Sequence, residues 1–284
     1  MSPSTPVSDI RPSALAGTWY PGDPAQLARS VDASLDRADV APIPGRLIGV
    51  LAPHAGHRYS GAIAAHAFKP ARGLDIDVVA LIGPSHYPYR GRVLTSGHSA
   101  YSTPLGTIPV AHDLLDVLMH EIPLETLRES QEHSLENELP FLQRALGQFR
   151  LLPLMLIDQS LRIAEALGTA LGELLRGQKA LLVASSDLSH YYPQAIAAEL
   201  DAAILSEIEA FDPEAVIRAE EEERGFACGR GAIAAVMIAA RALGADSARV
   251  VGYATSGDVT GDYAQVVGYG AAVFYASDER RTTE

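Results

Sequence analysis

The sequence predicts one α/β domain with a central, mainly parallel or mixed β-sheet flanked by helices. Residues 47–52, 78–83 and 180–184 are continuous apolar runs of strand length. Runs of this kind are typical of strands buried on both faces, as in parallel sheets. Helix-like segments separate them, and this alternation favours an α/β fold. No linker interrupts the chain between about residues 46 and 276, so one domain is expected.

We expect this domain to cover residues 11–276. A disordered start over residues 1–10 precedes it and a polar tail over residues 277–284 follows it. Terminal segments of this kind, polar and without apolar periodicity, are typically poorly ordered. No internal repeat is found in the chain.

Cap residues and apolar spacing predict where the elements lie. Asp23 followed by Pro24 suits the start of a helix, and Asp212 with Pro213 repeats this start. Pro140 interrupts a segment with leucines at helical spacing, so it either kinks that helix or begins a new turn. The predicted helices cover residues 23–37, 60–68, 111–120, 135–146, 163–176, 194–211 and 229–243. The predicted strands cover residues 46–52, 77–82, 149–157 and 180–184, with a closing pair at 249–255 and 265–275.

The charge and the cysteine count exclude several classes of function. A net charge of −13 argues against nucleic-acid binding, which needs a basic surface, and against a polybasic membrane anchor. The longest wholly apolar stretch, residues 232–240, is too short to cross a bilayer. The first residues lack the basic-then-apolar order of a signal peptide. A single cysteine suits a reducing compartment, so we expect a cytoplasmic protein.

Each of the three apolar runs leads to a histidine in a tight turn. His54 lies in Ala-Pro-His-Ala-Gly, His86 in Gly-Pro-Ser-His and His190 in Asp-Leu-Ser-His. Ligands of open α/β sheets bind at the carboxyl ends of the strands, so neighbouring strands would gather these histidines at one edge. A lone histidine of this kind more often only hydrogen-bonds a loop. The repeated pattern indicates an active site or a metal site.

Cys228 lies immediately before an apolar helix and two residues from Arg230. The helix dipole and the arginine charge both favour the thiolate, which is a soft metal ligand and a nucleophile. Taken alone, such a cysteine is more often a small buried hydrophobe. With His54 and His86 it forms a candidate metal site of two histidines and one cysteine. Iron, copper and zinc all suit this donor set, and the sequence does not choose among them.

Asp187 and His190 form a candidate catalytic pair after the third run. Asp187 is placed to orient an imidazole, and His190 to act as a general acid/base or as a further ligand. No Gly-x-Ser-x-Gly turn marks a serine nucleophile. A metal-free alternative uses Cys228 as the nucleophile with His54 or His190 as its base.

The sequence leaves the roles of two further pairs of neighbouring residues undecided. Glu132 and His133 open a predicted helix, where they either cap the helix or support the metal ligands from behind. Trp19 and Tyr20 lie in a loop rich in glycine and proline. This aromatic pair is either a plug in the core or one wall of a pocket.

Six motifs occur in one order along the chain. They are Ala16-Gly-Thr-Trp-Tyr-Pro, Ala52-Pro-His-Ala-Gly, Gly83-Pro-Ser-His, Glu132-His-Ser-Leu-Glu, Ser185-Ser-Asp-Leu-Ser-His and Cys228-Gly-Arg. Together they resemble the Memo family, which is called AmmeMemoRadiSam system protein B in prokaryotes. The resemblance covers about residues 11–275, nearly the whole chain.

This resemblance implies a fold like that of class III extradiol dioxygenases, the non-haem iron enzymes that open catechol rings. It implies that His54, His86 and Cys228 hold a metal, and that His190 matches an acid/base histidine. Cys228 stands where those dioxygenases use a glutamate, and a soft thiolate shifts the preference toward copper or thiolate-ligated iron. The family name also implies two protein partners, a radical S-adenosylmethionine protein and an Ammecr-type protein.

Two classes of function follow. The first hypothesis is a metal-binding oxidoreductase with a redox or dioxygenase-like activity on a small molecule. The alternative is a non-catalytic binding or adaptor module that takes a peptide or a partner protein in the same pocket. The sequence leaves the substrate, the metal and the oligomeric state open.

Overall fold

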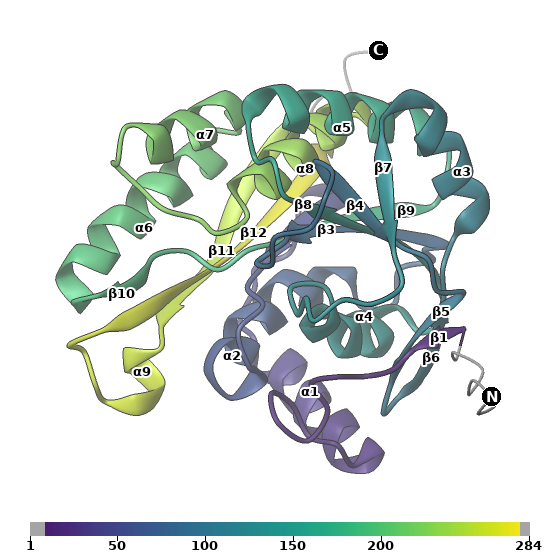
Figure 1. The fold of residues 1–284 in the computed structure, drawn as a ribbon. Coiled ribbons are helices and arrows are strands. Elements are labelled where there is room, and N and C mark those ends of the chain that lie inside the picture. The colour runs from purple at the N-terminus through teal and green to yellow at the C-terminus, as the bar shows by residue number, and fades with distance from the viewer. Residues whose placement is uncertain (1–8, 279–284) are drawn as a thin grey trace.

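Strand pairing forms the framework of the molecule, of which the computed structural model describes residues 9–278. The strands are β1 (Ile10–Arg11), β2 (Gly45–Ala52), β3 (Val78–Pro84), β4 (Val93–Ser96), β5 (Ala100–Thr103), β6 (Gly106–Pro109), β7 (Leu124–Leu127), β8 (Arg150–Leu156), β9 (Ala180–Ser185), β10 (His190–Tyr192), β11 (Ser247–Thr255) and β12 (Val266–Ser277). Over the described range, nine of them form one mixed sheet in the order β10-β12-β2-β9-β3-β8-β4-β7, with β11 paired to β12 (Figure 1). A separate small sheet has the order β1-β5-β6.

The ends of the domain differ slightly from the predicted bounds. The predicted disordered start and polar tail fall mostly on residues 1–8 and 279–284, which lie outside the described residues. Ile10 already belongs to β1 and Ser277 is the last residue of β12. The ordered chain therefore begins before residue 11 and continues beyond residue 276.

The four central strands, β2, β9, β3 and β8, run parallel and are almost wholly buried. All seven residues of β3 and the last six of β2 are buried. Their apolar runs therefore fill both faces of the sheet, which confirms the predicted strands and the mixed α/β fold. Leu51 of β2 and Ile82 of β3 both pair with Ala184 of β9. The carboxyl ends of these three strands are therefore level with one another.

Antiparallel strands complete the sheet on both sides of this parallel centre. On one side β12 pairs with β2, and both β11 and β10 pair with β12. On the other side β4 runs antiparallel to β8. The closing strand pair predicted near the carboxyl end is confirmed by β11 and β12.

Helices cover both faces of the large sheet. They are α1 (Pro24–Arg37), α2 (His57–Phe68), α3 (His112–Glu121), α4 (Leu139–Leu146), α5 (Leu161–Leu174), α6 (Gln194–Glu209), α7 (Pro213–Glu221), α8 (Arg230–Ala242) and α9 (Gly257–Thr260), with the 3-10 turns η1 (Lys69–Ala71) and η2 (Glu136–Glu138). Helices α5, α7 and α8 lie on one face of the sheet, whereas α1, α2 and α4 lie on the other (Figure 1). In residues 9–278 no helix has the length and apolar character needed to cross a membrane.

The two helix starts predicted at Asp23-Pro24 and Asp212-Pro213 are confirmed at the level of single hydrogen bonds, whereas the helices predicted from residues 60 and 163 begin at His57 and Leu161. The Asp23 side chain accepts a hydrogen bond from the Gln26 backbone N–H at 2.7 Å, and Asp212 caps α7 in the same way. Each aspartate satisfies a backbone donor that the first helical turn leaves free. Pro140 begins a new turn rather than a kink, because the 3-10 turn η2 ends where α4 begins.

Short elements were not predicted from the sequence. They are β1, β4, β5, β6, β7, β10 and α9. Each has only two to four residues, too few for an apolar period to show. Their pairing depends on distant partners, as where Ile10 of β1 pairs with Ala100 of β5.

Candidate metal centre

Three neighbouring strands and one helix position the candidate site. His54 follows β2 by two residues and His86 follows β3 by two residues, while β9 lies between these strands. The level strand ends therefore bring both imidazoles to one edge of the sheet. Cys228 lies far from both histidines in the sequence, in the turn that leads into α8.

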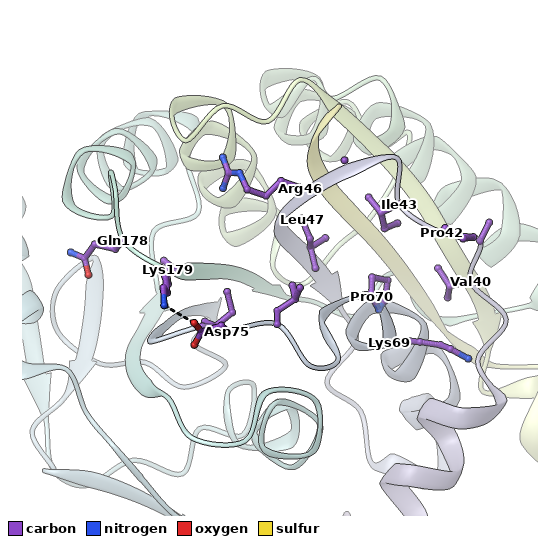
Figure 2. Close-up of a pocket in the computed structure, with 15 residues that line it drawn as sticks. Val40, Pro42, Ile43, Arg46, Leu47, Lys69, Pro70, Asp75, Gln178 and Lys179 are labelled. Carbon is purple, nitrogen blue, oxygen red and sulfur yellow. Dashed lines mark hydrogen bonds and ion pairs between the residues drawn. The ribbon is translucent and has the colours of Figure 1, made fainter. Parts of the chain in front are cut away.

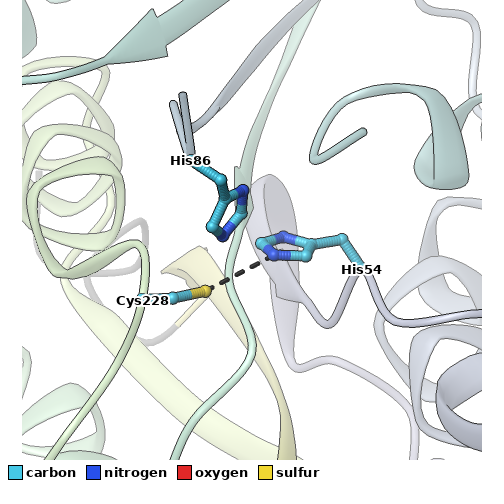
Figure 3. A group of neighbouring side chains, drawn as sticks. All are labelled: His54, His86 and Cys228. Atoms are coloured by element: carbon cyan, nitrogen blue, oxygen red, sulfur yellow. Dashed lines mark hydrogen bonds between the residues drawn. The ribbon is translucent and has the colours of Figure 1, made fainter. Parts of the chain in front are cut away.

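The two histidines and the cysteine surround a common point. The Cys228 sulfur lies 3.4 Å from Nε2 of His54, and the rings of His54 and His86 meet edge to face with centroids 5.3 Å apart. One donor atom from each of the three side chains lies within 4.8 Å of the other two (Figure 3). Two imidazole nitrogens and a sulfur match the donor preferences of iron, copper and zinc. The residues present therefore fit a transition metal.

The other ring nitrogen of each histidine is already engaged. Nδ1 of His54 lies 2.9 Å from Ser185 Oγ, and Nδ1 of His86 lies 2.9 Å from Glu132 Oε1. Contacts of this kind fix the orientation and the tautomer of metal-ligating histidines. They leave Nε2 of each ring free for a ligand.

Glu132 is a buried carboxylate behind His86. Its Oε1 accepts hydrogen bonds from the backbone N–H groups of His133 and Ser134, both at 2.8 Å, and its Oε2 accepts one from the backbone N–H of His86. Burial raises the pKa of Glu132, but the hydrogen bonds and charge of His86 outweigh burial and lower that pKa to about 2. Glu132 also lies close enough to His86 and His133 to form a second donor group. Because both of its oxygens are occupied, it serves better as an anion that orients His86.

His133 and Trp19 extend the site toward solvent. The His133 ring stacks on His86 with centroids 4.5 Å apart, and the Trp19 ring lies 4.7 Å from His133. Burial is the main cause that lowers the pKa of His133, so this imidazole favours its neutral form.

The centre opens into a cavity of about 590 Å³. Trp19, His133 and His190 are among the residues that line it. Tyr20 is not among them and instead lines a separate cavity of about 370 Å³ beside α1 and α2, so of the predicted pair Trp19 alone is a wall of this cavity. The Tyr20 side chain is buried, and its hydroxyl donates a hydrogen bond to Glu136 at 2.7 Å. Of the aromatic pair, Trp19 forms the wall and Tyr20 packs in the core.

The predicted pairing of Asp187 with His190 is wrong. The Asp187 carboxylate accepts hydrogen bonds from the backbone N–H groups of His54, at 2.8 Å, and of Ala55, at 3.3 Å. Burial raises the pKa of Asp187 to about 7. His190 instead uses Nδ1 to contact the Leu188 carbonyl at 2.7 Å. Asp187 therefore fixes the turn that carries His54, and the chain's own backbone orients His190.

The environment of Cys228 also differs from the prediction. Burial, followed by the charge of Asp187, raises the pKa of this thiol above its ordinary value. Arg230 turns away and pairs with Glu220. The sulfur is instead contacted by the Ser186 hydroxyl, whose Oγ lies 3.7 Å from Sγ, and by the Asp187 backbone N–H at 3.3 Å. A metal that binds here would displace the thiol proton.

The family model of the Memo-like proteins matches residues 11–273 of this sequence. The chain belongs to the Memo-like family. A MEMO1 family protein of Nitrosopumilus maritimus is 35% identical over 276 residues, covering 93% of this chain and 99% of that protein. One from Aeropyrum pernix is 38% identical over 281 residues, covering 92% and 98%. The resemblance noted in the six motifs is thereby confirmed.

A solved structure is also similar to this Memo-like chain. It is the crystal structure of uncharacterized protein JW3007 from Escherichia coli K12, with a TM-score of 0.47 and 14% sequence identity. The match covers 80% of this chain and 100% of that chain.

Three polar residues of this Memo-like site were missed by the sequence analysis. Ser185 contacts Nδ1 of His54, Asn137 donates to the His54 carbonyl, and Glu138 contacts Ser185. All three are buried. The run Glu136-Asn-Glu, polar amid leucines at helical spacing, is the signal that could have indicated Asn137 and Glu138, whereas Ser185 has no such signal.

A second cavity of the Memo-like domain, of about 570 Å³, lies at the opposite end of the sheet. Residues near the amino ends of β2, β3 and β9 line it, including Ile43 and Leu47 (Figure 2). Lys179 and Asp75 form an ion pair of 2.5 Å there, and both side chains are well exposed. Because ligands of α/β sheets bind at the carboxyl ends of strands, the cavity beside the histidines is the better candidate site.

Proposed function

We propose that this Memo-like protein binds one transition-metal ion, iron or copper in the first place and zinc as the alternative, through His54, His86 and Cys228. The bound metal serves a redox or dioxygenase-like reaction on a small molecule. The observation that carries this proposal is the convergence of two Nε2 atoms and one sulfur around a common point. The contacts of both Nδ1 atoms with Ser185 and Glu132 support it, because they orient the rings in advance.

Such a metal supplies Lewis-acid and redox chemistry when it is bound. The protein supplies proton transfer and access. Nδ1 of His190 faces a carbonyl, which only accepts hydrogen bonds, so the neutral imidazole carries its proton on Nδ1 and presents an unprotonated Nε2. His190 lines the cavity and is therefore the candidate general base. Trp19 and His133 limit the entrance, and the cavity volume of about 590 Å³ suits a small molecule.

The alternative function is a binding or adaptor module without turnover. It is favoured by the aromatic residues at the mouth of the same cavity, Trp19, Tyr59 and Tyr191, whose exposed fractions are 37%, 39% and 69%. Exposed aromatic side chains around a pocket are typical of surfaces that hold a peptide or a partner protein. A radical S-adenosylmethionine protein and an Ammecr-type protein are proposed partners on family grounds alone.

The metal-free nucleophile is the least supported alternative. Cysteine chemistry requires the thiolate, and the burial of Cys228 opposes ionisation of its thiol. We place the metal chemistry in a reducing compartment, the cytoplasm, because a lone cysteine that serves as a metal ligand has to stay reduced.

Elemental analysis tests the proposal. The protein is purified without a chelator or a histidine tag, as the wild type and as His54→Ala, His86→Ala and Cys228→Ser. His120→Ala is the matched control, since His120 is exposed on α3. We expect one iron or copper ion per chain in the wild type and the control, and strong loss from the three site variants, with circular dichroism showing intact folds.

The opposite result has an equally clear meaning. Wild-type protein that is free of metal and takes up neither added Fe(II) nor added Cu(I) contradicts the metal site and favours the binding module. Unchanged metal content in His54→Ala and His86→Ala places any bound metal elsewhere.

A further inference from the structure

Ser185 is a buried hydroxyl that three groups contact at once. Its Oγ lies 2.6 Å from the Ser134 carbonyl oxygen, 2.9 Å from Nδ1 of His54 and 3.0 Å from Oε1 of Glu138. A serine hydroxyl has one proton to donate and two lone pairs that accept. These three contacts therefore use its whole hydrogen-bonding capacity.

The partners decide in which direction each hydrogen bond runs. A backbone carbonyl can only accept, so Ser185 donates its single proton to Ser134, which is also the shortest of the three contacts. The two remaining contacts are then hydrogen bonds that Ser185 accepts. His54 has to donate from Nδ1, and Glu138 has to donate from a protonated carboxyl group.

The surroundings of Glu138 agree with a protonated carboxyl group. The residue has no exposed surface, and within residues 9–278 its Oε2 has no hydrogen-bond partner. A buried carboxylate would need a cation or several donors, and Ser185 is its one recorded side-chain partner in that range. Burial is the main cause that raises the pKa of Glu138 well above its ordinary value, and it outweighs the contact with Ser185, which lowers that pKa.

We propose that Glu138 is a neutral acid that donates a hydrogen bond to Ser185, and that Ser185 thereby holds His54 in the tautomer with its proton on Nδ1. Ser185 and Glu138 are positioning residues, and neither touches the metal position. The tautomer directs the Nε2 lone pair of His54 toward Cys228, whose sulfur lies 3.4 Å away. That these hydrogen bonds prepare His54 to bind a metal rests on the proposed function. The hydrogen bonds themselves do not depend on it.

The same 3-10 turn holds His54 from a second side. Asn137, which precedes Glu138 in η2, donates a hydrogen bond from Nδ2 to the His54 backbone carbonyl at 2.5 Å. Asn137 therefore fixes the backbone of His54 directly. Its neighbour Glu138 acts on the His54 ring through Ser185. An imidazole held in this way presents Nε2 without rearrangement, which favours binding by avoiding an ordering cost.

Two spectroscopic measurements on the metal-free protein test the inference. In protein labelled with ¹⁵N-histidine, two-bond ¹H–¹⁵N correlations report the tautomer of His54, whose signals are identified by their loss in His54→Gln. Infrared spectra report the carbonyl stretches of protonated carboxyl groups, and we expect Glu138→Gln to remove the component of Glu138 while any component of Asp187 or Asp201 remains. Glu129→Gln is the matched control, because Glu129 is exposed. An Nε2-protonated His54 in the wild type, or a protonated-acid band unaffected by Glu138→Gln, overturns the proposal.

The variants separate the roles of the two residues. The side-chain amide introduced by Glu138→Gln can still donate to Ser185, so the His54 tautomer is expected to be unchanged. Ser185→Ala removes the acceptor of Nδ1–H, so a second tautomer should become populated. An unchanged tautomer in folded Ser185→Ala contradicts the role of Ser185. The tautomer is read in the wild type, so the test needs only His54→Gln to fold for the assignment and does not depend on the stability of Ser185→Ala.

The pH dependence of stability gives an independent reading of the Glu138 proton. Above the ordinary glutamate pKa of 4.5 the unfolded chain releases this proton while the folded protein keeps it. The unfolding equilibrium of the wild type, relative to Glu138→Gln, should then shift toward the unfolded state by about tenfold per pH unit. Parallel pH profiles would show that Glu138 ionises normally and contradict the proposal.

The inference and the proposed function fail in different ways. A Nδ1-protonated His54 in a protein that takes up no metal supports the inference and rejects the metal function. If the protein binds one metal ion per chain but His54 of the metal-free protein carries its proton on Nε2, the metal function is supported and the inference is rejected.

Discussion

Glu132 contacts His86 at two atoms at once. One carboxylate oxygen faces Nδ1 of the imidazole at 2.9 Å, while the other accepts the backbone N–H of the same residue. The ring and the turn that carries it are therefore oriented by a single buried anion. Glu132 is not one of the three candidate ligands, but its removal should disturb the candidate ligand His86 directly.

Glu132→Ala should lower the affinity for Fe(II) or Zn(II) by about 10- to 100-fold, because His86 loses the acceptor that fixes its ring. Competition with a chromophoric chelator measures the affinity. Glu129→Ala, at an exposed position three residues away, is the control and should bind like the wild type. Equal affinities for both variants would mean that Glu132 does not support the centre.

Trp19 should report binding at the centre through its fluorescence. It is the single tryptophan of the chain, its ring lies 4.7 Å from His133, and it lines the cavity. Copper quenches nearby indole emission, so titration with Cu(I) or Cu(II) should lower the signal and saturate at one ion per chain. His54→Ala should abolish the saturable part. Stoichiometric copper uptake with unchanged emission would place the ion away from this cavity.

Glu136→Ala should destabilise the protein by about 3–5 kcal/mol, because it leaves buried donors without an acceptor. Glu136 accepts hydrogen bonds from the Ala14 and Leu15 backbone and from the Tyr20 hydroxyl, and it pairs with Arg11 at 3.5 Å. Urea unfolding measures the loss. Limited proteolysis should show earlier cleavage near residues 11–20.

The control for this prediction is an exposed glutamate. Glu121→Ala, at the end of α3, should change the unfolding free energy by less than about 0.5 kcal/mol. If Glu136→Ala were as stable as Glu121→Ala, its hydrogen bonds would have no net value for the fold.

Asp201 should make the stability of the protein depend on pH. This fully buried carboxyl accepts hydrogen bonds from the Ser189 N–H and the Tyr253 hydroxyl, and burial raises its pKa. The folded protein therefore keeps the proton to a higher pH than the unfolded chain does. Its stabilising contribution is complete below the ordinary pKa of 3.8 and is lost as the pH rises through the folded pKa.

Urea unfolding between pH 4 and pH 8 measures this effect. The wild type should lose stability with rising pH relative to Asp201→Asn, whereas the exposed-site variant Asp116→Asn should follow the wild type. A difference between wild type and Asp201→Asn that stays constant over this range would show that Asp201 ionises normally.

The fold is predictable where its signal is local. Strands such as β3 are buried along their whole length, so an apolar run suffices to reveal them. The approach of His54 to His86 is predictable for the same reason, since both follow strands of this kind. The small sheet of β1, β5 and β6 carries no comparable signal, because its strands are short and their partners lie far away in the sequence.

The surroundings of the candidate ligands are not predictable in this way. Ser185 meets Nδ1 of His54 across 131 residues and Glu138 across 47 residues. Polar residues of these types usually face solvent, so a buried network of them is invisible without the fold. The expectation that Arg230 favours the Cys228 thiolate fails for a similar reason, because Arg230 lies two residues away in the sequence but pairs with Glu220 in the fold.

The separation of the ligands along the chain determines when the centre can form. Cys228 follows His54 by 174 residues, so at ordinary rates of translation it leaves the ribosome roughly 10–35 s after His54. Throughout that interval the His54 imidazole lacks its sulfur partner, and for most of it Ser185 has not been synthesised either. A nascent chain therefore cannot present all three candidate donors until Cys228 has emerged. Under the proposed function, a metal would therefore enter the complete donor set late in synthesis or after it.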